Sequence, residues 1–220
     1  MTHARRFDLV VFDWDGTLFD STALIVRCIQ AASRDLGVAV PSDADAAYVI
    51  GLGLHDALQH AVPGLPLARY PELSKRYRHH YLARQDELVL FAGTLAMLQA
   101  LKERNHLLAV ATGKSRRGLD DALAHAQLQG LFDATRTADE TASKPDPLML
   151  RQLMAQLGVA PERTLMIGDT THDLLLARNA GTPRVAVSFG AHESEAFAEY
   201  EPLFVAHSTA QLHRWLTDNV

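Results

Sequence analysis

The sequence predicts an α/β protein with a doubly wound parallel sheet in a Rossmann-like core and an all-helical cap inserted after the first strand. Apolar runs recur along the chain, and helical segments separate them, which is typical of a sheet covered on both faces. The alternation stops once, between residues 19 and 91, where only helical signals occur. A chain of 220 residues that is 48% hydrophobic is long enough for such a core and an insertion.

The predicted core strands are short apolar segments that read as continuously buried, because a parallel sheet with helices on both faces exposes neither side. They are Leu9–Phe12 and residues 107–111, 132–134, 165–167, 185–187 and 204–205. One helix is expected to start near Thr94. Another is expected to start at Pro147 and to end just before Gly158. We therefore assign residues 1–18 and 92–220 to the core.

The predicted cap comprises residues 19–91 and contains three helices with recognisable ends. Asp20 or Ser21 caps the first, which runs to Leu36 and stops at Gly37. The second covers residues 42–51, and the third runs over residues 70–84. From this topology, the two chain segments that join cap and core, 19–21 and 90–93, are expected to form the two strands of a hinge.

Two acids, Asp13 and Asp15, follow directly after the first strand. Ligands of open α/β sheets collect at the carboxyl ends of the strands, so this pair is well placed for chemistry. Residues i and i+2 of a strand point to the same side, which brings the two carboxylates together if the strand geometry persists. Gly16 permits close backbone approach and Thr17 offers a hydroxyl. The alternative is an ordinary Asp-Gly turn in a solvated loop.

Reactive residues follow three more segments of the chain. Thr112-Gly113-Lys114-Ser115 comes after one strand, Gly168-Asp169 with Asp173 after another, and Ser143-Lys144 precedes a helix. Taken singly, these could be a strand-to-helix turn, a helix N-cap and a surface charge. Together with Asp13 and Asp15 the set resembles the haloacid dehalogenase superfamily, whose four motifs are present in order over essentially the whole chain.

The resemblance implies a metal-dependent covalent mechanism. Asp13 is the candidate nucleophile, because a covalent route divides a hard displacement into two easier steps. In the family, Mg²⁺ is held by the equivalents of the Asp13 carboxylate, the Asp15 backbone carbonyl and Asp169. Asp173, four residues after Asp169 and on the same face if the helix has begun, would hold a metal-bound water or orient another ligand.

The remaining core roles concern proton transfer and phosphoryl binding. Asp15 is the candidate acid and base, and phosphatases and phosphomutases of the superfamily carry an Asp there whereas its dehalogenases and phosphonate hydrolases do not. The Thr112 hydroxyl, with backbone N–H groups at and after Gly113, is expected to bind phosphoryl oxygens. Lys144 would neutralise the charge that builds on those oxygens.

Specificity is expected to come from the cap, where Gly51-Leu52-Gly53-Leu54-His55 lies at a break between helices. The position of this loop resembles that of the substrate-specificity loop of phosphoglycolate phosphatases and β-phosphoglucomutases. His55 is a candidate substrate contact, with an ordinary helix-start histidine as the alternative. Lys114, Arg116 and Arg117 are expected to be solvated, with Lys114 the best of the three for a secondary contact. His172 either tunes the site or faces solvent.

These observations predict a Mg²⁺-dependent phosphatase of the phosphoglycolate phosphatase branch that hydrolyses a small phosphomonoester. A phosphomutase of the β-phosphoglucomutase type is the runner-up. A receiver-type phospho-acceptor module is disfavoured by the cap and by the order of the motifs. We expect a small phosphorylated metabolite as the partner and a cytoplasmic monomer or homodimer.

Binding to nucleic acid or membrane is not expected. The formal net charge is −5, and no basic run is dense enough for a nucleic-acid footprint. No stretch has the length of a bilayer span. The single cysteine, Cys28, excludes an internal disulfide and is expected to be an inert buried thiol.

Overall fold

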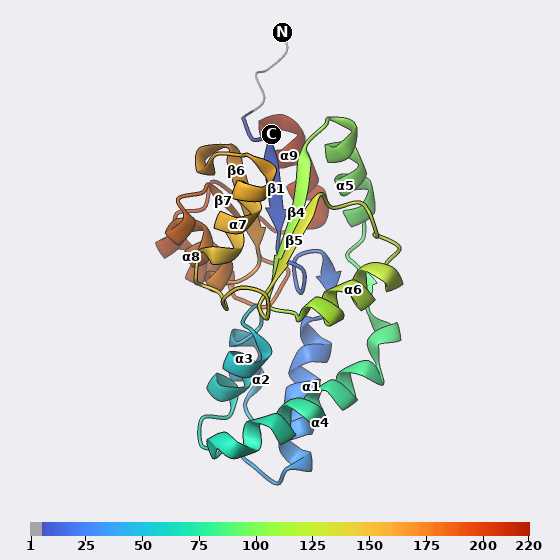
Figure 1. Cartoon of the computed structure of the whole chain (residues 1–220), viewed down its shortest axis with the longest axis vertical. Coiled ribbons are helices and arrows are strands. Elements are labelled where there is room, and N and C mark those ends of the chain that lie inside the picture. Colours follow the sequence, from blue (N-terminus) through green and yellow to red (C-terminus); the bar gives the residue numbers. More distant parts are fainter. Residues whose placement is uncertain (1–5) are drawn as a thin grey trace.

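A computed structural model describes residues 6–220, and its centre is a six-stranded parallel sheet (Figure 1). The strand order is β5-β4-β1-β6-β7-β8, and every neighbouring pair is parallel. The strands are β1 (Leu9–Phe12), β4 (Leu107–Thr112), β5 (Ala134–Thr137), β6 (Thr164–Gly168), β7 (Arg184–Val187) and β8 (Val205–Ala206). The central strand β1 pairs with β4 on one side and β6 on the other.

Helices cover both faces of the sheet, as predicted. Val10 and Phe12 belong to one apolar cluster and Leu9 and Val11 to another, because alternate residues of a strand point to opposite faces. The first cluster packs against α5 (Thr94–Glu103), α6 (Arg116–His125) and α9 (Thr209–Asn219), and the second against α7 (Leu148–Leu157) and α8 (Thr171–Ala180). The doubly wound α/β architecture is confirmed.

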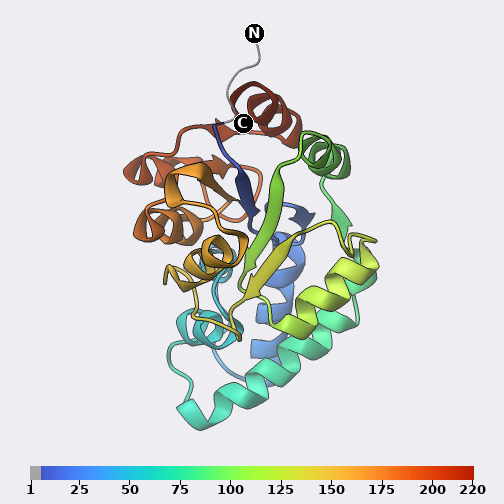
Figure 2. The same cartoon turned by 45° about the horizontal axis from the view of Figure 1, so that its top comes forward.

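A group of helices lies beyond the carboxyl ends of the strands (Figures 1 and 2). It comprises α1 (Thr22–Asp35), α2 (Asp43–Tyr48), α3 (Leu54–Ala61) and α4 (Tyr70–Leu82), and its apolar cluster includes the buried Ile29, Leu58 and Leu73. The strands β2 (Phe19–Asp20) and β3 (Val89–Leu90) pair antiparallel where this group joins the sheet. Short 3-10 turns occupy Leu67–Arg69, Gln85–Glu87, Pro161–Arg163 and Ser194–Tyr200.

One strand differs from its prediction. The sequence favours residues 132–134, whereas β5 covers Ala134–Thr137. Phe132 lies outside the strand, where its ring packs edge-on against Trp14 with centroids 6.3 Å apart. This contact accounts for an apolar residue at a position that is not in the sheet. The strand itself carries Thr135 and Arg136, which an edge strand tolerates because one side of it is open to water.

Several element ends also move by a few residues. The last strand starts at Val205 rather than Phe204, α2 ends at Tyr48, and α4 ends at Leu82. The helix α3 has no counterpart among the three predicted cap helices. Ser21 precedes α1 as expected, but its hydroxyl makes no cap hydrogen bond and is used elsewhere.

None of the helices within residues 6–220 combines the length and the apolar character that crossing a bilayer requires. Cys28 is buried on α1, and burial raises the pKa of its thiol to about 11, as expected of an inert thiol.

Truncation in the sheet should cost far more stability than truncation in an exposed turn. Leu165 on β6 is fully buried, so Leu165→Ala removes packed atoms and should lower the free energy of unfolding by about 2–5 kcal/mol. Leu67 is 74% exposed, and Leu67→Ala should change it by about 0.5 kcal/mol or less. Urea unfolding followed by circular dichroism measures both. Equal losses would contradict this assignment of the core.

Candidate active site

A buried lysine joins two of the predicted acids. The Lys144 Nζ donates to Asp13 Oδ1 at 2.5 Å and to Asp173 Oδ1 at 2.6 Å, and all three side chains are essentially inaccessible to water. Burial alone would lower the pKa of Lys144, but the two carboxylates outweigh it and hold the pKa above its usual range. The two carboxylates thus favour the charged form of Lys144 inside the protein.

Three carboxylates gather around this lysine at the ends of β1 and β6. Asp13, Asp169 and Asp173 each place an oxygen within 4.8 Å of the others. Burial raises the pKa of Asp13 well above its usual value despite the attraction of Lys144, and the other two carboxylates add to the rise. Burial and the charge of Asp173 raise the pKa of Asp169 to about 7. If all three carboxylates were ionised, they would carry more negative charge than one lysine balances, which is why these pKa values rise.

The carboxylate cluster fits a hard divalent cation. Asp13 Oδ2 is buried and finds no hydrogen-bond partner among residues 6–220, although buried polar atoms are almost always paired. Carboxylate oxygens are the ligands that Mg²⁺ prefers. Asp13 and Asp169 would hold such an ion, which would neutralise part of the negative charge of the cluster.

Asp169 is fixed by a hydroxyl, a backbone amide and two glycines. Thr17 Oγ1 donates to its Oδ1 at 2.7 Å, and the Ala191 amide donates to its Oδ2 at 2.7 Å. A Cβ at Gly16 would lie 2.1 Å from Asp169 Oδ2, and one at Gly190 would lie 2.2 Å from it. Both positions therefore need glycine, and Gly16 also has a φ of +82°.

Asp173 is held by the start of the helix that carries it. The Thr170 hydroxyl and amide both donate to Asp173 Oδ2, at 2.6 and 3.1 Å, and the Asp173 amide donates to Thr170 Oγ1 at 3.2 Å. This reciprocal capping box opens α8 at Thr171. Asp169 thus precedes the helix, so the condition for a shared helical face with Asp173 is not met. The turn before α8 places the two acids close together instead.

Asp15 lies apart from this cluster, on the side that faces the helical group. Strand β1 ends at Phe12, so the geometry that would align Asp13 with Asp15 does not extend that far. The Ser21 hydroxyl donates to Asp15 Oδ1 at 2.7 Å. Lys114 Nζ lies 3.0 Å from Asp15 Oδ2. Each carboxylate oxygen of Asp15 therefore has a polar partner.

Lys114 is not the solvated charge that the sequence analysis expects by default. Its side chain is 11% exposed, and besides Asp15 it donates to the Tyr81 hydroxyl at 2.9 Å. Its ammonium also lies 4.9 Å from the centroid of the Tyr81 ring. Burial opposes the charge, but Asp15 and Tyr81 together raise the pKa of Lys114 above its usual range. Tyr81 belongs to α4, so Lys114 connects the helical group to Asp15.

Thr112 and Gly113 lie at the end of β4, next to β1. Thr112 is 1% exposed, and its Oγ1 accepts from the Lys114 amide at 3.2 Å. Gly113 packs against the loop before α3, where a Cβ would lie 2.3 Å from the Leu52 carbonyl oxygen. The Gly53 amide donates to Ser143 Oγ at 2.9 Å. The loop before α3 thus packs against Gly113 and Ser143, the residues beside Thr112 and Lys144.

The candidate substrate-contact histidine, His55, is not part of the buried carboxylate cluster. His55 is exposed at the start of α3, where its ring meets that of Tyr70 edge-on with centroids 6.1 Å apart. Its side chain lines the same cavity as Asp15. The substrate-contact hypothesis for His55 stays a prediction.

His172 is buried rather than exposed, and it contacts the cap together with a second histidine. The Nε2 atoms of His172 and His192 lie 2.7 and 3.0 Å from the carbonyl oxygen of Tyr48 on α2. Burial lowers the pKa of both imidazoles. The Thr171 amide donates to His192 Nδ1 at 3.1 Å, which leaves the Nε2 of a neutral His192 as the donor to Tyr48.

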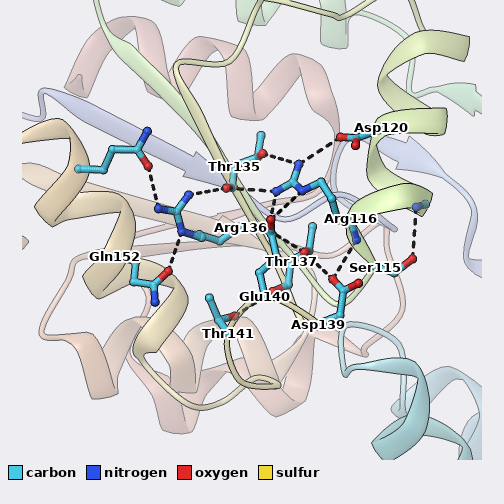
Figure 3. Close-up of polar contacts among 12 residues, drawn as sticks. Ser115, Arg116, Asp120, Thr135, Arg136, Thr137, Asp139, Glu140, Thr141 and Gln152 are labelled. Carbon is cyan, nitrogen blue, oxygen red and sulfur yellow. Dashed lines mark hydrogen bonds and ion pairs between the residues drawn. The ribbon is translucent and has the colours of Figure 1, made fainter.

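A polar network anchors the loop that precedes Lys144 (Figure 3). The Arg116 guanidinium donates to Glu140 at 2.6 and 3.0 Å and to Thr135 Oγ1 at 2.9 Å. Asp139 accepts from the Arg116 amide at 2.9 Å and from Thr137 Oγ1 at 2.7 Å. Arg116 therefore has structural partners, whereas Arg117 is 92% exposed, as expected.

A cavity of about 860 Å³ lies between the sheet and the helical group and reaches Asp15. Asp13 and Lys144 do not line it. Its walls come from α1, the loop before α3, α4 and the segments after β4 and β5. Asp15 thus stands between the cavity and the buried cluster.

Several residues of the site were not among the predicted site residues. Four residues contact an acid or a lysine of the site: Thr17, Ser21, Thr170 and Tyr81. Thr170 has a sequence signal, since a threonine three residues before an acid predicts a capping box. Tyr81 has none, because its contact with Lys114 depends on how α4 packs against the sheet.

Protein stripped of divalent cations should lose stability as the pH rises from about 4.5 to 8. The pKa of Asp169 is about 7 in the folded protein against 3.8 for an ordinary Asp, and that of Asp13 is also raised. Between these values the folded state binds more protons than the unfolded state, so deprotonation favours unfolding, by at most about 1.4 kcal/mol per pH unit for one proton. Urea unfolding in chelator at several pH values measures this slope.

Two comparisons make that measurement specific. Asp169→Asn should reduce the slope, because the amide does not titrate and only the contribution of Asp13 is left. Adding Mg²⁺ at pH 8 should restore stability to the unaltered protein. A free energy of unfolding that stays constant over this pH range would contradict the raised pKa values.

Known proteins resemble this chain in sequence and in fold. The chain is 34% identical to the probable phosphatase IndB of Dickeya dadantii (strain 3937), over 93% of this chain and 91% of that protein. It is 30% identical to pyrophosphatase PpaX of Bacillus cereus (strain AH820), over 97% and 98% of the two chains. A haloacid dehalogenase-like family hydrolase from Streptococcus pneumoniae matches its structure with a TM-score of 0.84 and 25% identity, over 97% and 100%. The family model of haloacid dehalogenase-like hydrolases matches residues 10–187, and the chain therefore belongs to this family.

Proposed function

We propose that this protein is a Mg²⁺-dependent phosphatase that hydrolyses the phosphomonoester of a small metabolite through an aspartyl-phosphate intermediate. The observation that carries the proposal is the buried set of Asp13, Asp169 and Asp173 around Lys144. The names of the relatives, a probable phosphatase for IndB and a pyrophosphatase for PpaX, support hydrolysis of a phosphate bond as the reaction class. A cation held by Asp13 and Asp169 would supply charge neutralisation at the phosphoryl group.

Asp13 is the proposed nucleophile. Its Oδ1 accepts a hydrogen bond from Lys144, and its Oδ2 has no hydrogen-bond partner within residues 6–220. Attack by a carboxylate oxygen forms a bond to phosphorus while the bond from phosphorus to the leaving oxygen breaks. Lys144 offers a fixed positive charge beside the phosphoryl oxygens, in a site that excludes water. Thr112 and the amides that follow it are proposed to bind the same oxygens.

Asp15 is the proposed acid and base. Its carboxyl group would give a proton to the departing alkoxide, and as a carboxylate it would then take one from the water that cleaves the aspartyl-phosphate. Its contacts with Ser21 and Lys114 support this role, because they hold the carboxyl group at the wall of the cavity. Substrate would have to enter there, since Asp13 lies behind it.

Turnover of p-nitrophenyl phosphate should require Mg²⁺ and Asp13. Chelation should abolish phosphate release and added Mg²⁺ should restore it. Asp13→Asn, which is nearly isosteric, should lower kcat about a thousandfold or more because the amide is a poor nucleophile. Asp20→Asn changes an exposed acid on β2 and serves as the matched control that should keep full activity. Full activity of folded Asp13→Asn would rule out the covalent route.

Asp15→Asn should separate substrates by their leaving groups. An alkyl phosphate needs a proton on its leaving oxygen, so its kcat should fall about 10²- to 10⁴-fold. Formation of the aspartyl-phosphate from an aryl phosphate should fall about tenfold or less, because p-nitrophenolate leaves without a proton. The burst of p-nitrophenolate in rapid mixing measures this first step. Equal losses for both substrates would mean that Asp15 acts only through structure.

A further inference from the structure

The cavity beside Asp15 indicates what kind of leaving group the enzyme accepts. On the proposed function, on which this inference rests, Asp15 protonates the leaving oxygen. Asp15 lines the cavity whereas Asp13 and Lys144 do not, so the cavity lies on the leaving-group side of the phosphoryl site. The part of the substrate beyond the phosphate must therefore occupy it.

The volume of the cavity is far beyond that of a compact acid. At about 860 Å³ it falls in the range of pockets that bury drug-sized ligands, about 300–1,000 Å³. A group as small as the glycolate of 2-phosphoglycolate would leave most of it filled with water. The free energy available from burying the leaving group would then go unused.

More of the cavity wall is apolar than polar, although charged residues also line it. Trp14 and Phe19 stack with ring centroids 4.8 Å apart, and Tyr77 and Tyr81 stack at 5.9 Å. Other wall residues are aliphatic: Ile25, Ile29, Val49, Ile50, Leu54 and Leu88. Such a lining favours an apolar or aromatic group, because burying apolar surface is favourable and burying an unpaired charge is costly.

The cavity is poorly suited to a second anion. Lys114, the cation next to Asp15, is already held by that carboxylate and by Tyr81. Arg78 and Arg117, the other lysine or arginine side chains of the described lining, are exposed. The acids Asp15, Asp56, Asp121 and Asp139 line the same cavity and outnumber these cations. A carboxylate or a second phosphate would lack a free buried cation to pair with.

We propose that the substrate is the phosphomonoester of a bulky, largely apolar alcohol, with an aromatic ring or a comparable planar group that the Leu54, Tyr77 and Tyr81 side chains enclose. The helical group supplies these three side chains, and the core supplies the wall segments after β4 and β5 and the phosphoryl chemistry. This substrate class is larger and less charged than the 2-phosphoglycolate-like ester that the sequence predicts. It also differs from inorganic pyrophosphate.

A matched pair of esters tests the proposal. Ethyl phosphate and 2-(2-naphthyl)ethyl phosphate both release a primary alcohol, so the chemical step needs the same proton and only the cavity distinguishes them. With Mg²⁺, kcat/KM for the naphthyl ester should exceed that for ethyl phosphate, 2-phosphoglycolate and pyrophosphate by at least about tenfold. A kcat/KM for ethyl phosphate, 2-phosphoglycolate or pyrophosphate equal to or above that of the naphthyl ester would overturn the proposal.

Variants locate the effect in the cavity. Leu54 lines it, so Leu54→Trp should reduce the naphthyl-to-ethyl ratio of kcat/KM about tenfold by filling the space. Leu67→Trp makes the same exchange at a 74% exposed position outside the cavity and should leave both rates unchanged. Should Leu54→Trp fail to fold, Leu82→Trp, at an exposed end of the lining, makes the same test. An unchanged ratio in the folded variant would contradict the assignment of the cavity.

Binding without turnover separates this inference from the proposed function. Calorimetry with the non-hydrolysable ethylphosphonate and 2-(2-naphthyl)ethylphosphonate should show at least about tenfold tighter binding of the naphthyl compound in Mg²⁺. If no phosphate ester is hydrolysed but this preference is present, the proposed phosphatase function fails and the binding class stands. If esters are hydrolysed but the phosphonates bind equally, the substrate class fails alone.

Discussion

The contact on which the site depends is the buried bridge from Lys144 to Asp13 and Asp173. Three carboxylates inside a protein repel one another and lose their hydration, and a lysine fixed between two of them offsets part of that cost. Losing the lysine would leave uncompensated buried charges. The surrounding structure can be understood as support for this bridge: a network around Arg116 and Glu140 holds the loop before Lys144, and Thr170 holds Asp173.

The core and its four motifs were predictable because their signals are local. A buried parallel strand is a continuous apolar run, and acids that follow such runs must meet at one edge of the sheet. The bounds of strand β5 were not predicted, because an edge strand can contain polar residues such as Thr135 and Arg136. The roles assigned to Asp13, Asp15, Thr112 and Lys144 stay predictions that the geometry supports.

The contacts between cap and core could not be predicted in the same way. Lys114 and Tyr81 are 33 residues apart, and only the packing of α4 brings them together. A lysine at that position has the same sequence signal whether it is solvated or paired with Asp15. The size of the cavity is likewise a property of how α1, α3 and α4 pack, since no single segment encloses it. The character of the leaving group therefore becomes visible only in the folded chain.

The hydrogen bonds that join α2 to the core are made by the backbone carbonyl oxygen of Tyr48. Two imidazoles, those of His172 and His192, reach the same carbonyl oxygen, while the exposed fraction of Tyr48 is 54%. Any residue at position 48 presents that oxygen, so the two hydrogen bonds depend on the path of the backbone. The Tyr48 ring adds a separate contact, because it stacks on His192 with centroids 5.3 Å apart and meets His172 edge-on at 5.1 Å. Substitutions at position 48 would therefore reveal only the ring contacts, whereas substitutions of the two histidines would reveal both kinds of contact.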